Sequence, residues 1–454
     1  MKNKKETLLI LIMLITICII IFNRDKLYEA KYIEPKDTLL AITINGEIST
    51  TFPTTKMYTG TVECTSGSGK VDWNGTKWIL TTSGITKGST KCNATFITKV
   101  PTFAETILAK NEVKTPITTP GAAISTASEA LLASAVDDYG TSYYFRGAVK
   151  NNYVEFANKC WRIVRVGGDG SVKLILHNDN IAGTANPCNS ANNSTSAAFA
   201  RHSGKIYTSA FNEYHQENAY VGFMYGDFTR GCNDHPEITS EYDCLSAGYT
   251  WIRSSSYAEA HANIHKSTIL TNLETWYNSN LKTYESVIAD TVWCNDKTNV
   301  TDTTYEPWSN DSNVTGLGYG INKTYYGATQ RLVSTSRSAG GTGPSLKCNG
   351  ELSKINSKVG LITADELAFA GYAYRLDNTT TYLQENATSD YWWSLSPFCF
   401  DGSSAHVWRV DGSYGSFGNG VVNNARRVRP SISLKPSINV TGDGTSSSPY
   451  IISM

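Results

Sequence analysis

The cysteines constrain this chain most, because their number and spacing indicate a fold tied together by disulfides. Ten cysteines occur among 454 residues, and Cys18 lies in an apolar N-terminal run. Cys64 and Cys92 bracket one short β-rich segment, so we expect them to form a pair. Cys399 is left over. Three more disulfides, with their connectivity open, are expected among Cys160, Cys188, Cys232, Cys244, Cys294 and Cys348.

The N-terminal run predicts that the rest of the chain is exported. It extends from Leu8 to Phe22 and is interrupted only by Thr16. A membrane-spanning helix usually needs about 20 apolar residues, but flanking side chains can extend a shorter run. A cleaved signal peptide is the alternative, but no small-x-small cleavage site follows, which favours an uncleaved anchor over residues 1–27. The expected location is the cell membrane, single-pass, with an extracellular C-terminal portion.

Composition favours a β-rich extracellular protein and does not indicate binding to nucleic acid or to an anionic membrane surface. Charged residues make up only 18% of the chain and the formal net charge is zero, so no charged field indicates binding to nucleic acid. The 26 tyrosines and 10 tryptophans are typical of strands.

Turn signals and proline positions divide the exported part. We expect a small β-sandwich-like domain over residues 38–100, a linker over 101–125, a large domain over 138–436 and a turn-rich tail over 437–454. Asn45-Gly46 and Asn74-Gly75 each lie between β-prone runs and predict hairpins. A two-residue turn at Asn74-Gly75 places Asp72 opposite Lys77 and Val71 opposite Trp78.

Helices are expected at three places in or before the large domain. The stretch 126–140 predicts a short helix, and 267–281 places Leu270, Leu273, Trp276 and Tyr277 on one helical face. Within 359–372, a strand is followed by a helix that begins at a capping box of Thr363 and Glu366 and ends at Gly371.

The order of motifs in the large domain resembles a bacterial extracellular domain family. The matching residues, which span about Tyr143 to Pro436, are Trp161-Arg162-Ile163-Val164, Leu270 to Tyr277, Gly360 to Glu366, Trp392 to Pro397, Ala405, Val407, Val410, Gly412, Val428-Arg429-Pro430 and Leu434. That family looks related to the formylglycine-generating-enzyme-like branch of the C-type lectin fold. The resemblance implies an α+β, C-type-lectin-like (formylglycine-generating-enzyme-like) C-terminal domain, preceded by a transmembrane helix and a small all-β domain.

The same branch includes variable receptor proteins that retroelements diversify within a C-terminal segment. Sulfatase-activating relatives use a C-terminal cysteine pair to bind copper, but this chain has only Cys399 in that region, so their oxidase chemistry is not carried over. The resemblance therefore implies cell-surface binding by a receptor or adhesin with no cofactor. The expected partner is an unknown protein or glycan.

The segment 398–426 combines aromatic residues with Gly, Ser and Asn, which is typical of adaptable binding surfaces. A bulge or an early strand end is expected near Arg409, because Val410 falls out of step with Val407. The expected scaffold is Ala405, Val407, Trp408, Val428, Arg429, Ile432 and Leu434. The candidate ligand-binding residues are Phe398, Phe400, Asp401, Ser403, Ser404, His406, Arg409, Asp411, Tyr414, Phe417, Asn419, Asn423, Asn424 and Arg426.

Other readings of these residues stay open. A Gly-rich segment can be an ordinary solvated loop, and the domain can serve as a non-binding structural envelope protein. An enzyme of unassigned chemistry is a third class, but no nucleophile, phosphate-binding or zinc motif supports it. His261 and His265 lie four apart without the Glu that a zincin needs. Asp302, Glu306 and Asp311 lack the spacing of a calcium loop.

Overall fold

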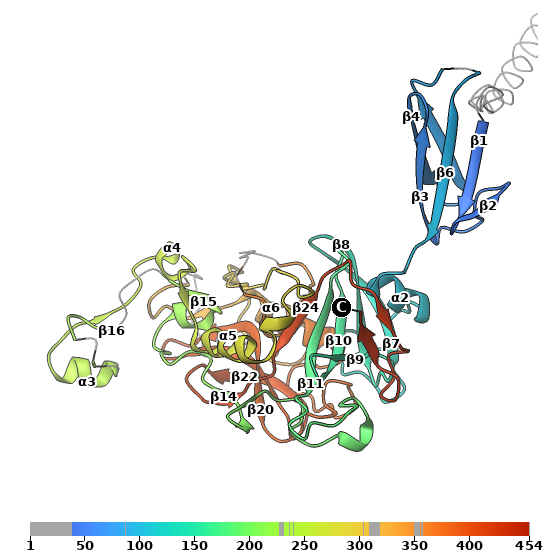
Figure 1. Ribbon diagram of the computed structural model, residues 1–454. Coiled ribbons are helices and arrows are strands. Elements are labelled where there is room, and N and C mark those ends of the chain that lie inside the picture. Colours follow the sequence, from blue (N-terminus) through green and yellow to red (C-terminus); the bar gives the residue numbers. More distant parts are fainter. Residues whose placement is uncertain are drawn as a thin grey trace, which may run out of the picture. The chain divides into compact units, whose positions relative to one another are not determined.

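The computed structural model describes residues 39–86, 88–226, 231–235, 237–238, 240–302, 304–307, 318–348, 355 and 357–453. The chain divides into two compact units, with the boundary between Val100 and Pro101 (Figure 1). The membrane anchor expected over residues 1–27 lies outside the described residues. Within the ranges above, no helix is long and apolar enough to cross a membrane. The expectation of a single-pass membrane protein is corrected accordingly, since the described residues include no spanning helix.

The first unit packs two small sheets against each other. Four strands in the order β2-β1-β6-β3 form one sheet, and the hairpin β4–β5 forms the other. Ile42, Val71, Ala94 and Phe96 are buried between them. The strands are β1 (Leu39–Ile44), β2 (Glu47–Ser49), β3 (Tyr58–Cys64), β4 (Ser68–Trp73), β5 (Trp78–Ser83) and β6 (Lys91–Thr98).

The two Asn-Gly turns differ. β1 and β2 form the expected two-residue hairpin, with positive φ at both Asn45 (53°) and Gly46 (88°). Between β4 and β5 the turn takes four residues, so Asp72 pairs with Ile79 and Val71 with Leu80. The predicted pairings with Lys77 and Trp78 are wrong. The reason is that Oδ1 of Asn74 accepts hydrogen bonds from the N–H groups of Thr76 and Lys77, which closes a wider turn.

The second unit contains two larger sheets. The first has eight strands, in the order β24-β11-β10-β9-β26-β25, with β8 on β10 and β7 on β8. Its strands are β7 (Ala130–Asp137), β8 (Gly140–Gly147), β9 (Tyr153–Phe156), β10 (Lys159–Val166), β11 (Val172–Asn178), β24 (Ser431–Leu434), β25 (Val440–Thr441) and β26 (Tyr450–Ile452).

Three segments of the second unit differ in secondary structure from the prediction. The helix predicted over 126–140 is wrong: these residues form β7, which pairs with β8 along its whole length, so tertiary pairing overrides the helix propensity of its alanines. The segment expected as a linker contains α2 (Phe103–Lys110), with Phe103 and Ile107 buried. The segment expected as a tail supplies β25 and β26.

The other large sheet carries the C-terminal segment. It has six strands, in the order β14-β23-β20-β21-β22, with β19 also on β20. Its strands are β14 (Thr208–Ser209), β19 (Thr324–Tyr325), β20 (Tyr391–Phe400), β21 (Ala405–Asp411), β22 (Ser416–Val421) and β23 (Arg426–Arg427). The irregularity predicted near Arg409 is present on the β20 side only: β21 pairs with β22 without interruption, but its pairing with β20 shifts register between Trp393, opposite Arg409, and Pro397, opposite Val407. Val407 and Val410 lie on opposite faces and are both buried, since the sheet is covered on both sides there.

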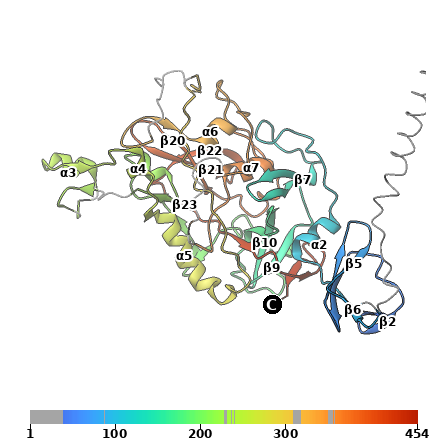
Figure 2. The ribbon, with the colours of Figure 1, turned by 90° about the horizontal axis from the view of Figure 1, so that it is seen from above.

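Helices and short hairpins surround the two sheets. The predicted helix α5 (Thr268–Asn280) buries the expected face, and α7 (Ala364–Ala370) begins at the predicted capping box. The other helices are α3 (Glu241–Ser246), α4 (Tyr257–Ala260), α6 (Gly327–Leu332), and the 3₁₀ turns η1 (Ser190–Asn192), η2 (Asn218–Val221) and η3 (Lys282–Tyr284). The short strands are β12 (Arg201–His202), β13 (Lys205–Ile206), β15 (Met224–Tyr225), β16 (Gly231–Cys232), β17 (Trp251–Ile252) and β18 (His265–Lys266). β16 and α3 lie away from the two large sheets of this unit (Figure 1), and Figure 2 shows the same for α3.

The fold class expected from the sequence is wrong. Among the described residues 34% are in strands and only 14% in helices, so the chain is mostly β and not α+β with a C-type-lectin-like domain behind a transmembrane helix. The described helices are short, and the longest of them, α5, has 13 residues.

Four disulfides tie the two units internally. Cys64–Cys92 confirms the first predicted pair, and the open connectivity resolves to Cys160–Cys188, Cys232–Cys244 and Cys294–Cys348. Cys399 lies outside these pairs and is buried. Disulfides of this number are typical of proteins in an oxidising, extracytoplasmic compartment.

Candidate ligand-binding site

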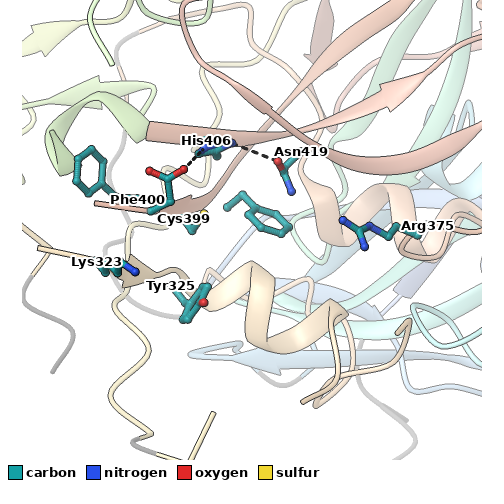
Figure 3. Close-up of a pocket in the computed structure, with 9 residues that line it drawn as sticks. Lys323, Tyr325, Arg375, Cys399, Phe400, His406 and Asn419 are labelled. Atoms are coloured by element: carbon teal, nitrogen blue, oxygen red, sulfur yellow. Dashed lines mark hydrogen bonds and ion pairs between the residues drawn. The ribbon is translucent and has the colours of Figure 1, made fainter. Parts of the chain in front are cut away.

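A cavity of about 260 Å³ lies over one face of the C-terminal sheet. Strands β19, β20, β21 and β22 supply its walls, together with Arg375 from the turn that follows α7. Figure 3 shows His406 and Asn419 on one side of the cavity, Lys323 and Tyr325 across from them, and Arg375 beyond Asn419. The lining residues are Lys323, Tyr325, Arg375, Phe398, Cys399, Phe400, Asp401, His406 and Asn419.

His406 is held at both ring nitrogens. Its Nε2 lies 3.1 Å from Oδ2 of Asp401, and its Nδ1 lies 3.2 Å from Oδ1 of Asn419 (Figure 3). Asn419 is on β22, whereas His406 is on the neighbouring β21 and Asp401 is in the turn before it. The imidazole is therefore fixed in orientation between two strands and a turn.

Asp401 is held as a carboxylate. Its Oδ1 accepts hydrogen bonds from the N–H and hydroxyl of Ser403 and from the N–H of Ser404. Partial burial raises the pKa of Asp401, but the hydrogen bonds from His406, Ser403 and Ser404 outweigh it and hold that pKa well below its usual range. All of these bonds are internal, so Asp401 shapes the cavity wall.

A second cavity, of about 350 Å³, adjoins the first along β22. Arg375 and Asn419 belong to the walls of both cavities, so the two form one groove, which we name the edge groove. The second cavity is lined by Tyr374, Arg375, Arg409, Asp411, Ser416, Phe417, Gly418 and Asn419.

Arg375 has an unusual backbone. Its φ is +55°, a left-handed conformation that is uncommon for residues other than glycine. Its N–H donates to the carbonyl oxygen of Phe417 (2.8 Å), and Tyr374 forms an isolated parallel bridge with Phe417. The chain then turns back, since the N–H of Leu376 donates to the carbonyl of Ala373. This turn places the exposed guanidinium of Arg375 beside β22.

A buried aromatic cluster supports the groove from beneath. The ring of Trp408 lies 4.4 Å from Phe417, 4.8 Å from Phe398 and 5.7 Å from Tyr374, measured between centroids. Phe398, Phe400 and Phe417 are each only 1% exposed, so these three candidate binding residues are part of the core. The predicted scaffold residues are also buried: Ala405, Val407, Trp408, Val428, Arg429, Ile432 and Leu434.

The remaining candidate residues do not gather in one place. Ser403, Tyr414, Asn423 and Asn424 are exposed in turns outside the groove, and Ser404 contacts His215. Arg409 and Arg426 lie over the ring of Tyr391, at 3.8 Å and 4.6 Å from its centre. The structure thus brings together Asp401, His406, Arg409, Asp411 and Asn419 around the groove, with Phe398, Phe400 and Phe417 in its base. The candidates that do not line it are Ser403, Ser404, Tyr414, Asn423, Asn424 and Arg426.

The sequence did not reveal several groove residues. Lys323, Tyr325, Tyr374 and Arg375 come from segments outside 398–426 and reach the groove through β19 and through the turn after α7. Tyr374-Arg375 follows the predicted helix stop at Gly371, so the start of an irregular segment was the only available signal. Within the described ranges, no group of three or more His, Cys, Asp or Glu is placed to hold a metal ion.

Comparisons with known protein-family models, with curated protein sequences and with solved structures found no match for this chain. The function is therefore inferred from the groove itself.

Proposed function

We propose that this chain is an exported, non-catalytic binding protein that holds its ligand in the edge groove. The observation that carries the proposal is that two cavities share the lining residues Arg375 and Asn419. Asn419 lies on β22, the last strand of the C-terminal sheet. Binding sites are commonly concave, with an apolar base and a few fixed polar groups. Here Phe398 and Phe417 form part of the base, and Asn419 is one of the polar groups.

The hydrogen bonds of His406 and Asp401 support binding over catalysis. Both ring nitrogens of His406 are already occupied, and Asp401 already accepts from His406 and two serines. Both groups thus form hydrogen bonds within the chain, which supports a role in shaping the groove. Fixed rotamers on packed strands suit recognition, because little side-chain entropy is lost on binding.

We further propose that the exposed part of the segment is a variable surface of a receptor or adhesin, as the family resemblance implies. The burial of Phe398, Phe400 and Phe417 narrows the replaceable positions, because large buried side chains cannot change freely. The positions that remain are Asp401, Ser403, Ser404, His406, Arg409, Asp411, Tyr414, Asn419, Asn423, Asn424 and Arg426.

Binding is tested with arrays of peptides and oligosaccharides probed with the full chain. The triple variant Arg375→Ala, His406→Ala and Asn419→Ala removes groove side chains without touching the aromatic base. We expect it to lose binding to the ligands that the native chain captures. Tyr242→Ala, an exposed position on α3, is the matched control. Equal binding by the triple variant and the control would remove the edge groove from the site.

Diversification is tested separately from the neighbouring DNA. We expect a near-copy of the coding region for Trp392 to Arg429, differing at adenines, beside a reverse transcriptase gene. If the differences in such a copy fell on the codons of Phe398 and Phe417 as often as on those of Asn419 and Asn423, the division into core and variable positions would be wrong.

A further inference from the structure

We infer that the ligand of the edge groove is an extended peptide that pairs with the outer edge of β22 and places an acidic side chain between Arg375 and Arg409. This inference rests on the proposed binding role of the groove. It specifies both the class of ligand and the way in which the ligand is held.

The outer edge of β22 offers backbone groups to a new strand. β22 is the last strand of its sheet, with β21 on its inner side. The carbonyl of Phe417 points outward, because it accepts the N–H of Arg375. Backbone directions alternate along a strand, so the N–H and C=O of Asn419, two residues further on, point to the same outer side. Asn419 is thus the next pairing position along this edge.

A short segment of the chain already pairs with the outer edge of β22, at Phe417 only. Tyr374 bridges Phe417 in parallel, and the left-handed backbone of Arg375 then turns the chain away from β22. Gly418 carries no side chain, and a Cβ placed there would meet no atom within 4 Å. Outside the β-sheet ladder, no backbone group of the described residues pairs with Asn419, whereas the next outward carbonyl, that of Val421, accepts the N–H of Asn424. The open part of this edge is therefore centred on Asn419. Addition of a strand to such an edge is a common mode of peptide recognition, in which the backbone supplies affinity and pockets read alternate side chains.

Charge selects an acidic peptide. The exposed guanidinium of Arg375 forms no ion pair with any described carboxylate and lies only over its neighbour Tyr374, at 5.2 Å. Arg409 stacks on Tyr391, and its buried Nε has no hydrogen-bond partner in the described part of the chain. Two cations, Arg375 and Arg409, and one carboxylate, Asp411, thus border the second cavity, so its net charge is positive and an arriving carboxylate can accept hydrogen bonds from either guanidinium.

The alternation of an added strand matches the two cavities. His406 and Asn419 lie on one face of the sheet, whereas Arg409 lies on the other, because neighbours along a strand alternate and paired residues share a face. Successive side chains of an added peptide therefore point alternately toward the aromatic cavity and toward Arg409. We expect an apolar residue next to the acidic one. An acidic oligosaccharide satisfies the charge but makes no use of the strand edge.

The experiment uses the full chain and a synthetic heptapeptide library with Glu fixed at the centre, compared with the same library carrying Gln. We expect selected Glu peptides to bind at least about tenfold more tightly than their Gln counterparts. Arg375→Gln and Arg409→Gln should each reduce that preference. N-methylation of alternate peptide amides should abolish binding for one alternating set and spare the other, because only one set faces β22.

A matched pair of variants isolates the backbone of β22. Asn419→Pro removes the outward N–H, which an edge position tolerates, whereas Asn419→Ala removes the same side chain and keeps that N–H. We expect the proline variant to bind the selected peptides at least about tenfold more weakly than the alanine variant. Circular dichroism and the unfolding midpoint establish that both variants are folded to the same extent.

Three results separate this inference from the proposed function. If the proline and alanine variants bind peptides equally, strand addition is wrong. If uronate-containing oligosaccharides bind in place of peptides and the triple variant abolishes that binding, the peptide inference is wrong and the groove remains the site. If captured ligands bind the triple variant as well as the native chain, the proposed function itself fails.

Discussion

The rings of Trp408 and Phe417 lie 4.4 Å apart, centre to centre, on the paired strands β21 and β22. Trp408 also contacts Phe398, so one indole joins three strands of the C-terminal sheet. This contact holds β22 in place, and β22 carries Asn419, on which both cavities depend. The segment around β22 is rich in Gly, Ser and Asn, but its buried aromatic residues form a core that supports the polar residues of the groove.

The division into core and surface predicts opposite results for two neighbouring aromatic residues. Phe417→Ala should lower the free energy of unfolding by about 3 kcal/mol, because it leaves a cavity beneath the groove. Tyr414→Ala, at a side chain that is 61% exposed, should change that free energy by less than about 0.5 kcal/mol. Urea unfolding followed by tryptophan fluorescence measures both. A cost at Tyr414 equal to that at Phe417 would contradict the division.

The contact between His406 and Asp401 predicts a dependence of stability on pH. A carboxyl group with a lowered pKa in the folded state stabilises the fold above its unfolded pKa, and this contribution is lost as the pH falls through the folded-state value. Asp401→Asn should therefore lower the free energy of unfolding at pH 7 by about 1 kcal/mol, allowing for partial exposure, and by less in strong acid.

Ser413→Ala is a control for Asp401→Asn, because Ser413 is also exposed in a turn of this sheet but only its backbone contacts an aspartate. We expect its stability to track that of the native chain at every pH. An Asp401→Asn variant that loses the same free energy in strong acid as at pH 7 would show that the carboxylate charge makes no contribution.

Local signals made part of the fold predictable from the sequence. The capping box of Thr363 and Glu366 and the turn at Asn45-Gly46 were correct, because each depends on residues within one turn. The pair Cys64–Cys92 was also correct, since both cysteines flank the same short segment. β7 was missed, because its alanines favour a helix until β8 supplies a partner strand.

Only those groove residues that are close together in the sequence could be predicted, because the others reach the groove through tertiary packing. Asp401, His406 and Asn419 lie within one meander, so strand alternation was enough to place them together. Arg375 and Lys323 reach the groove only through the packing of α7 and β19, which no periodicity in the sequence encodes. The burial of Phe417 was also missed, because a Gly-rich context suggested a loop and hid a strand covered on one face.

Glu217 predicts a loss of stability as the pH rises. It is fully buried at the start of η2, and its Oε2 accepts from the N–H and hydroxyl of Ser254. Burial raises its pKa to about 7, against the opposing hydrogen bonds from Ser254. Between about pH 4.5 and 7 the unfolded chain releases this proton and the folded chain keeps it, so the free energy of unfolding falls with rising pH.

Glu217→Gln should remove this fall. The variant should match the native chain near pH 4 and exceed its free energy of unfolding by about 2 kcal/mol at pH 8, measured by urea unfolding. Glu213→Gln, an exposed neighbour, is the control and should leave the profile unchanged. If Glu217→Gln is less stable than the native chain at pH 8, the buried carboxylate stabilises the fold.

The last prediction concerns Arg429, whose guanidinium is buried and contacts carbonyl groups. Its Nε donates to the carbonyl of Leu176 (2.9 Å) and its Nη1 to that of Leu383 (2.6 Å), while the guanidinium lies 4.9 Å from the ring centre of Trp392. A lysine ammonium cannot reproduce this planar fork, so Arg429→Lys should lower the free energy of unfolding by about 2 kcal/mol. Arg375→Lys, at an exposed site, should change it by less than about 0.5 kcal/mol. Chemical unfolding at pH 7 compares the two, and equal effects would mean that the two carbonyl contacts of Arg429 contribute nothing to stability.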